Sequence, residues 1–347
     1  MKKIYLSFLL IILFSNIIDG QQLREQDIQK ITKSSKSHRI IGLGEEEHFF
    51  YGSNSNRIEI IKELIRKRLV QSIVFEYPGL NAFFINEYIH NRLNKADLLS
   101  SLRKFKPLDA GPFFDSKEML SFIDWVKEKN RTGNDIDILG MDFYNYSTAV
   151  EILQSTQIAD KNKITLDSIR HSFDTLTYYL KTSPSSLVKE ETRRLAEENF
   201  GKVKTLLSTI DTASSVSIRH VTRDLYDYAY LFTSLNSRDS VLFRNFRRID
   251  NEKKTFLIWA ANFHIQNDSL NMPIHSVSLF GNLMAKQYKE QYYKIGVLGS
   301  NPCKQTNDHR VLIPDASCSI KAKLDLIVII EKGDRTTSIL NNQEMPF

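Results

Sequence analysis

The ten residues Arg39–His48, RIIGLGEEEH, decide the fold that the sequence predicts. A short apolar run bounded by glycines is typical of a buried strand. This run ends abruptly in three carboxylates and a histidine. Because open α/β sheets bind ligands beyond the carboxyl ends of their strands, Glu45 and His48 are the first candidates for chemistry. Glu46 and Glu47 are interpreted as solvated loop residues.

Other apolar runs along the chain also end in polar side chains. These are Glu76 after 71–75, Asp142 after 136–141, and Asn262 and His264 after 254–260. Helical segments separate the four runs, so the strands should lie parallel and share one edge at their carboxyl ends. The sequence therefore predicts a single crevice lined by residues that are far apart in the chain.

The periodicity of the remaining chain predicts an α/β fold, with a mostly parallel sheet flanked by helices and a large helical cap. Residues 147–250 are nearly all helical in character, with one glycine (Gly201) and one proline (Pro184). Four helices are expected in this insertion, at about 147–157, 163–182, 186–210 and 214–247. Two more strands are expected at 293–298 and 324–330.

The helix after the first strand raises a question about Arg57. Residues 53–56, Ser-Asn-Ser-Asn, supply N-cap side chains, and the apolar spacing of 57–69 is helical. This would place Arg57 in the first turn, where the helix dipole disfavours a cation. We therefore expect Arg57 to have a partner.

Composition indicates a globular protein able to bury a core. The chain has 347 residues, of which 41% are hydrophobic and 25% charged, and its formal net charge is +6. Basic and acidic residues alternate along the helices and form no basic stripe interleaved with aromatics. A nucleic-acid partner is therefore not expected.

The N-terminus predicts export. Lys2 and Lys3 precede an apolar run of 11 residues, Ile4–Phe14, and this is the layout of a secretory signal peptide, with cleavage near Gly20. The alternative is an uncleaved anchor. Residues 1–20 are assigned to the signal peptide and 21–347 to the α/β domain. The mature chain is expected to be periplasmic or secreted, without stable membrane association.

The two cysteines of the chain, Cys303 and Cys318, lie 15 positions apart near the C-terminus. In an exported protein such a pair is expected to form a disulfide. A loop of that size would stabilise the fold by roughly 3 kcal/mol in the chain-entropy model. The alternative is two unpaired buried thiols.

The strand ends and the following helix together supply two histidines, three carboxylates and an arginine. Such a set provides a general base, an orienting partner and an anion stabiliser. Each residue also has a structural alternative. Glu45 could bind a backbone N–H at a helix start, Glu76 could be a turn residue, and Asp142 could cap the next helix. His48 could be a loop histidine, His264 a core residue, and Arg57 a surface cation.

The ordered set of motifs resembles the erythromycin esterase family. The similarity covers roughly residues 38–300, and the matching motifs are Gly44-Glu45 through His48 with Arg57, Glu76 after Ile73-Val74-Phe75, Gly140-Met141-Asp142, Arg238-Asp239 with Asn245, and Trp259 through His264. One position departs from the family pattern, because Ala261 stands where members often carry a histidine.

The resemblance implies a hydrolase that opens a macrolactone-type ester without a metal or other cofactor, and it suggests a role in antibiotic resistance. On this basis the catalytic residues would be His48, which activates water, Glu45 and Glu76, which support it, and His264, which together with Arg57 would bind or polarise the substrate carbonyl and the developing oxyanion. Substrate-binding positions would be Arg57, Asp142, Arg238 and Asn262. The partner would be a small-molecule ester, which the sequence does not identify.

Two other readings stay open. A metal-dependent hydrolase of related fold is one, because His48, His264, Glu45 and Glu76 have suitable ligand atoms, although no compact H-x-x-x-H or H-x-H cluster is present. The other is an exported protein that holds a ligand without turnover. A serine hydrolase is disfavoured, because no G-x-S-x-G elbow occurs.

Overall fold

The computed structural model describes residues 23, 25–45, 51–106, 116–156, 159–182, 186–209, 215–233, 238–267, 269–271, 276–298, 311–312 and 324–329. The signal peptide, His48, Cys303 and Cys318 lie outside these residues, so the expectations for them remain predictions. Among the described helices, none combines the length and the apolar character needed to cross a membrane.

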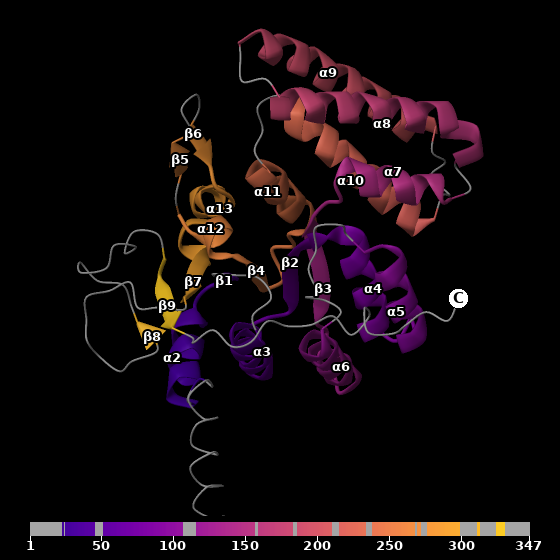
Figure 1. The fold of residues 1–347 in the computed structure, drawn as a ribbon. Coiled ribbons are helices and arrows are strands. Elements are labelled where there is room, and N and C mark those ends of the chain that lie inside the picture. The colour runs from indigo at the N-terminus through magenta and orange to yellow at the C-terminus, as the bar shows by residue number, and fades with distance from the viewer. Residues whose placement is uncertain are drawn as a thin grey trace, which may run out of the picture.

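A sheet with the strand order β3-β2-β4-β1-β7-β9-β8 forms the centre of the molecule (Figure 1). Its strands are β1 (Ile40–Glu45), β2 (Ser72–Pro78), β3 (Asp137–Asp142), β4 (Phe256–Ala261), β7 (Tyr292–Leu298), β8 (Val311–Leu312) and β9 (Leu326–Ile329). All neighbours pair in parallel except β8, which is antiparallel to β9. The predicted α/β class with a mostly parallel sheet is confirmed.

Helices surround this sheet. They are α2 (Glu25–Ser35), α3 (Tyr51–Arg66), α4 (Gly79–Ile89), α5 (Lys95–Lys104), α6 (Lys117–Arg131), α7 (Tyr146–Gln154), α8 (Ala159–Thr182), α9 (Ser186–Thr209), α10 (Val216–Thr233), α11 (Arg238–Ile249), α12 (Asn262–Ile265) and α13 (Phe280–Tyr288). The sequence did not predict β8, the short helix α12, or a small hairpin of β5 (Ser269–Asn271) and β6 (Ser276–Ser278).

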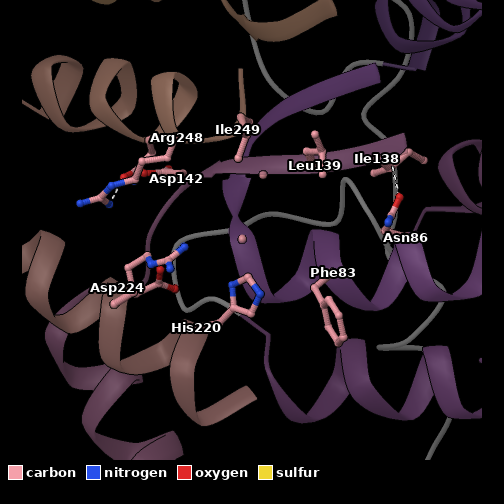
Figure 2. A pocket seen from close by; sticks show the side chains of 13 residues that line it. Phe83, Asn86, Ile138, Leu139, Asp142, His220, Asp224, Arg248 and Ile249 are labelled. Carbon is pink, nitrogen blue, oxygen red and sulfur yellow. Dashed lines mark hydrogen bonds between the residues drawn. The ribbon is translucent and has the colours of Figure 1, made fainter. Parts of the chain in front are cut away.

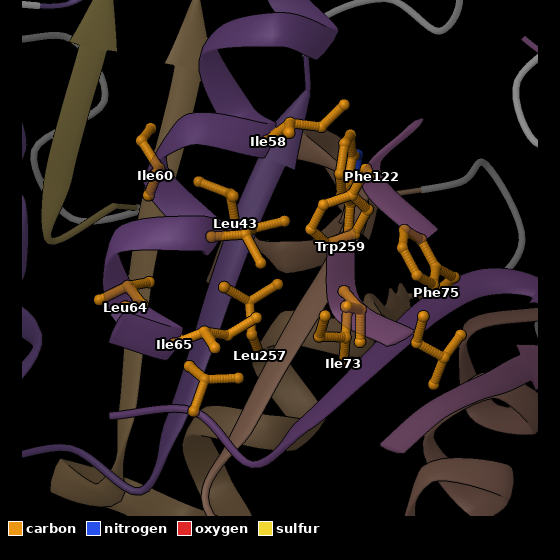
Figure 3. Close-up of a cluster of buried hydrophobic side chains, with 14 of the residues drawn as sticks. Leu43, Ile58, Ile60, Leu64, Ile65, Ile73, Phe75, Phe122, Leu257 and Trp259 are labelled. Atoms are coloured by element: carbon orange, nitrogen blue, oxygen red, sulfur yellow. The ribbon is translucent and has the colours of Figure 1, made fainter. Parts of the chain in front are cut away.

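Three hydrophobic cores hold these elements together. The first joins one face of the sheet to α3, α4 and α6, and Figure 3 shows its centre around Leu43 and Trp259. The second lies among α7, α8, α9 and α10, with Leu80 of α4 at its border. The third joins the opposite face of the sheet to α11 and α13 through Phe246 and Phe280. The strands read as near-continuous apolar runs because both faces of the sheet are covered.

The helical insertion between β3 and β4 is present, with one difference from the prediction. The expected helix 214–247 is two elements, α10 and α11. Leu225 of α10 is buried in the second core, whereas Phe246 of α11 is buried in the third. The two halves of this segment therefore pack on different parts of the molecule, which a single straight helix could not do.

The predicted start of α3 was wrong. The helix begins at Tyr51, so Arg57 lies in its second turn and not in its first. The asparagines expected to cap the helix make other contacts. The Asn56 Oδ1 accepts a hydrogen bond of 2.8 Å from the Leu23 backbone N–H, and the Asn54 Oδ1 accepts one from the Arg57 guanidinium. These two partners use the side-chain oxygens that a cap would need.

Candidate active site

The carboxyl ends of the first four sheet strands in chain order lie side by side. β3, β2, β4 and β1 are consecutive in the sheet and parallel, with Glu45 opposite Ala261 and Pro78 opposite Asp142. The sequence prediction that these strand ends share one edge is therefore confirmed. His48, the predicted base, follows β1 at this edge in the chain but lies outside the described residues.

Glu76 at the end of β2 is tied to both α12 and β4. One carboxylate oxygen lies 3.2 Å from the His264 Nε2, and the other accepts a 3.0 Å hydrogen bond from the Ala261 backbone N–H. The Glu76 side chain is buried. Residues that are 188 positions apart thus meet because β2 and β4 are neighbours in the sheet.

Asp239, at the start of α11, holds the other side of the His264 ring. Its Oδ1 lies 2.7 Å from the His264 Nδ1 and also accepts a 2.8 Å hydrogen bond from the Phe280 backbone N–H. Asp239 was not among the predicted site residues, although it stands in the quoted Arg238-Asp239 pair. An acidic residue in the first turn of a helix is common, so its position alone does not point to a histidine partner.

Arg238 joins two of the predicted carboxylates. Its Nη2 donates to Glu76 at 2.9 Å and also forms an ion pair with the Asp142 carboxylate. The Arg238 side chain is 42% exposed, in contrast to Glu76 at 7% and His264 at 11%. Of this group, Arg238 is the residue that a molecule arriving from solvent would contact most readily.

These contacts fix the charges of the group. Burial raises the pKa of Glu76, but the hydrogen bond and charge of His264, with Arg238 and the Ala261 N–H, outweigh it and lower the pKa to about 2. Burial lowers the pKa of His264, but the hydrogen bonds to Asp239 and Glu76 outweigh it and raise the pKa to about 9. At neutral pH the ring is an imidazolium between two carboxylates.

This protonation state defines the hydrogen bonds of His264. As an imidazolium it donates from Nδ1 to Asp239 and from Nε2 to Glu76. The Arg238 Nη1 lies 3.3 Å from the same Nε2. A protonated Nε2 has no lone pair to accept from Arg238, so this contact is a hydrogen bond only in the neutral ring. Burial lowers the pKa of Arg238, but Asp142 and Glu76 outweigh it and raise the pKa above its ordinary value.

Glu45 and Arg57 form a second cluster. The Arg57 Nη1 lies 2.7 Å from the Glu45 Oε2, which also accepts a 3.0 Å hydrogen bond from the Trp259 Nε1–H. The Arg57 guanidinium is fully buried and lies 5.0 Å from the centre of a Trp259 ring. Burial lowers the pKa of Arg57, and Glu45 opposes this shift. The expectation that Arg57 has a partner is confirmed.

The two clusters lie on opposite faces of the sheet edge. Glu45 is paired with Arg57 of α3, and α3 covers the face of the first core. Glu76 is paired with Arg238 at the start of α11, which covers the other face (Figure 1). Side chains alternate between faces along a strand, so neighbouring strand ends can present their carboxylates in opposite directions. Among the described residues, the candidate side chains therefore form two clusters on opposite faces of the sheet, and not the single crevice that the sequence predicted.

Asn262 makes contacts within the sheet. Its amide donates to the Val297 carbonyl at 2.5 Å and accepts from the Val297 N–H at 3.0 Å. A Cβ on Gly44 would lie only 2.0 Å from the Asn262 Oδ1, so glycine is needed there for this close approach. The amide thus ties the start of α12, directly after β4, to β7, and the substrate-binding role predicted for Asn262 stays a prediction.

Asp142 does not cap the helix that follows it, which was its structural alternative. The N-cap of α7 is Asn145, whose side chain accepts from the Thr148 backbone N–H at 2.9 Å. Nearby, the Asn245 amide donates to the Met141 carbonyl at 3.2 Å and thereby ties α11 to the end of β3. The Asp142 carboxylate is left for Arg238.

The charges of the His264 cluster bear on whether it fits a metal ion. Arg238 is paired with both Glu76 and Asp142, and both nitrogens of His264 face carboxylates. A divalent cation there would be repelled by the guanidinium and the imidazolium. Elsewhere in the described chain, His90, Asp135 and Asp137 could converge on a cation, but the Lys254 ammonium lies 2.5 Å from Asp137.

Comparisons with known proteins give a consistent result. A model of the erythromycin esterase family matches residues 69–301, about two thirds of the chain. The putative hydrolase YbfO of Bacillus subtilis (strain 168) is 20% identical, over 92% of this chain and 77% of that protein.

Two solved structures share the fold. One is a protein from Bacillus cereus, with a TM-score of 0.57 and 14% identity over 91% of this chain and 94% of its own. The other is a mutant of the erythromycin esterase EreC in its open conformation, with a TM-score of 0.51 and 17% identity over 89% of this chain and 80% of its own. At these identities the structures support the fold alone.

Proposed function

Because the chain belongs to the erythromycin esterase family, we propose that it hydrolyses carboxylic esters of the macrolactone type, with a histidine-activated water and without a metal ion. Family membership and the putative hydrolase YbfO support a hydrolase. The ester substrate and the metal-independent mechanism are our proposal.

The observation that carries the proposal is the array of Asp239, His264, Glu76 and Arg238. It places two cations at the carboxyl edge of the sheet, held by buried carboxylates that accept from backbone N–H groups. Ester hydrolysis passes through a tetrahedral oxyanion, and fixed positive charges lower the energy of that intermediate without reorganising. Arg238 is the exposed member and would meet the substrate carbonyl oxygen.

The proposed reaction begins with His48 as general base. His48 takes a proton from water while the water oxygen adds to the ester carbonyl carbon, and the carbonyl oxygen becomes an oxyanion beside Arg238. The intermediate then collapses and the bond to the alkoxyl oxygen breaks. His48 returns its proton to the leaving oxygen, so the products are an alcohol and a carboxylic acid, which releases its proton to solvent and becomes a carboxylate. For a macrolactone both groups stay on one opened chain.

Glu45 and Arg57 would act through His48 and would not contact the substrate themselves. Arg57 is fully buried, and so we propose that it positions Glu45 and the end of β1 instead of binding substrate directly. A carboxylate near an imidazole raises the basicity of the ring and fixes its tautomer. Glu45 and Arg57 would thereby prepare His48 for proton transfer.

The metal-independent mechanism is supported by charge. A catalytic metal would need a donor set with free lone pairs and net negative charge. In the His264 cluster each of the three carboxylates is already paired with a guanidinium or an imidazolium, so a metal ion would have to displace one of these cations.

We also propose that residues 1–20 act as a signal peptide for export and that Cys303 and Cys318 form a disulfide, because the sequence favours both.

The test is hydrolysis of a panel of aryl esters, alkyl esters and macrolactones by the chain starting at Gln21, with and without a chelator. We expect turnover that survives chelation, is lost in His48→Ala, and is kept in the matched control His171→Ala, which removes an exposed imidazole on α8.

Loss of turnover on chelation would favour the metal-dependent alternative. Full activity of His48→Ala would overturn the assignment of the base. Tight retention of a ligand without turnover would favour the binding protein.

A further inference from the structure

A pocket of about 190 Å³ lies beside the outer edge of β3 (Figure 2). β3 is the terminal strand of the sheet, and α4, α10 and α11 complete the walls. The Asn86 side chain accepts a 2.9 Å hydrogen bond from the Ile138 N–H and so covers one backbone group of this edge. In Figure 2, Asp142, Arg248 and Asp224 lie toward one end of the pocket, and Asn86 lies toward the other.

The pocket has one apolar wall and one basic wall. Its apolar lining comes from Phe83, Ile138, Leu139 and Ile249. The basic side chains are Arg223 of α10 and Arg248 of α11. Arg248 hydrogen-bonds to Asn245 at 2.8 Å and lies 3.4 Å from the Asp227 carboxylate, so its charge is partly balanced.

Arg223 is the cation that remains for a ligand. It is exposed and lines the pocket, so it lies where the pocket meets solvent. Within the described part of the chain, Arg223 makes neither a hydrogen bond nor a close ion pair. Of the two acids in the lining, Asp142 is paired with Arg238, and Asp224 is buried and accepts a 3.4 Å hydrogen bond from the Tyr144 backbone N–H. Burial raises the pKa of Asp224, and the charge of Arg223 opposes this shift.

His220 adds a neutral polar group. Burial, followed by the charges of Arg223 and Arg219, lowers the pKa of His220 to about 4, so the ring is uncharged at neutral pH. Its ring centre lies 5.6 Å from that of Phe83. No hydrogen bond to the ring nitrogens occurs among the described residues, and a neutral imidazole offers one donor and one acceptor.

Size limits the ligand further. An apolar protein cavity of about 150 Å³ is large enough for benzene. The present pocket has a similar volume and adds Arg223 and His220 at its wall. We propose that this pocket binds a small organic anion with an apolar, monocyclic body, of the aromatic carboxylate class. The carboxylate pairs with Arg223, and the ring packs against Phe83 and the β3 edge.

This site is distinct from the proposed ester site and does not depend on it. The two share Asp142, whose carboxylate also binds Arg238. The pocket extends from Asp142 back along β3 to Ile138, away from the carboxyl edge where Glu76 and His264 lie. Arg223 has no contact with that cluster among the described residues.

The experiment is isothermal titration calorimetry of the chain starting at Gln21 with benzoate, and with benzamide as the neutral ligand of the same shape. Three variants are compared: Arg223→Gln in the pocket, Arg238→Gln in the ester site, and Arg194→Gln, which removes the same charge from an exposed position on α9. Hydrolysis of the best ester is measured on the same samples.

We expect saturable binding of one benzoate, weaker binding of benzamide, and a roughly tenfold loss of benzoate affinity in Arg223→Gln. Affinity should be unchanged in Arg194→Gln. Absence of saturable binding would overturn the proposal, and so would equal losses in Arg223→Gln and Arg194→Gln. A loss in Arg238→Gln without one in Arg223→Gln would place the anion in the ester site, which also overturns it. Ester hydrolysis without benzoate binding would refute this pocket and leave the proposed function standing.

Discussion

The charge of His264 depends on two carboxylates that reach it from different elements. Asp239 faces Nδ1 at 2.7 Å and Glu76 faces Nε2 at 3.2 Å. Neither distance could be derived from the sequence, because Glu76 and Asp239 are 163 positions apart and reach His264 only in the folded protein. An imidazolium held this way suits the stabilisation of an oxyanion and does not suit a general base. This division of roles leaves His48 as the proposed base.

The Asp239→Asn variant tests how His264 is held. Asn keeps an oxygen for the Phe280 N–H but loses the charge, so the pKa of His264 should fall from about 9. If the imidazolium is required, we expect the alkaline limb of kcat/KM to move to lower pH and kcat to fall by roughly 10²-fold. Asp250→Asn is the control, because Asp250 binds Arg39 and Tyr288 instead. An unchanged pH profile would contradict this role of Asp239.

The same groups predict how stability depends on pH. The pKa of His264 is raised from 6.5 to about 9 by folding, so its contribution is complete below about pH 6.5 and is lost as pH rises through 9. The pKa of Glu76 is lowered from 4.5 to about 2, so its contribution is complete above about pH 4.5 and is lost as pH falls through 2.

We therefore expect the Tm of the wild-type chain to fall between pH 6.5 and 9, and this fall to be smaller in His264→Gln. Thermal unfolding followed by circular dichroism from pH 5 to 10 measures it. Equal declines in the two proteins would show that other groups cause the alkaline loss.

At the scale of elements, β1 depends on close packing at its glycines. A Cβ on Gly44 would collide with two residues of α12: Asn262, which ties this helix to β7, and Ile265. We expect Gly44→Ala to lower the free energy of unfolding by about 1–3 kcal/mol, because the strand or the amide must shift. Urea denaturation measures the change.

Gly201→Ala is the matched control for this substitution. A Cβ at Gly201, within α9, would meet no atom within 4 Å. Alanine is the better helix former, so this variant should gain about 0.5–1 kcal/mol. A stable Gly44→Ala protein would show that the approach of Asn262 to β1 is not tight in solution.

At the scale of the whole molecule, the second core makes the α7–α10 helices a separate packing unit. Leu225 is fully buried there, and the sheet packs on the other two cores. Leu225→Ala should cost about 2–5 kcal/mol within this unit. We expect amide hydrogen exchange to become faster in α7–α10, while protection of β1, β2 and β4 stays near its wild-type level. Equal loss of protection in the strands would mean that the molecule unfolds as one unit.

The sequence by itself determined the class of the fold. Buried strands such as 71–75 and 254–260 appear as apolar runs because helices cover both faces of the sheet, and this pattern is local. The polar residues that follow these runs could also be predicted, because a change from apolar to polar residues marks the end of a strand in the sequence. The predicted start of α3 failed where other contacts use the side-chain oxygens of the expected caps: the Asn56 oxygen accepts from the distant Leu23 N–H, and the Asn54 oxygen accepts from Arg57 in the same helix.

Only the tertiary structure decided how the strand-end residues combine. Glu45 and Glu76 were predicted in one crevice, yet one pairs with Arg57 of α3 and the other with Arg238 and His264 on the opposite face. Strand order, β-sheet alternation and helix placement set these pairings, which join residues 12 positions apart in Glu45–Arg57 and 162 and 188 positions apart when Glu76 meets Arg238 and His264. Asp239, the partner of the His264 Nδ1, stands in the Arg238-Asp239 motif, but the sequence does not pair it with His264, because that contact comes from the position of α11 against α12 and α13. The residue types are local information, but the charges they carry depend on which neighbours folding brings to them.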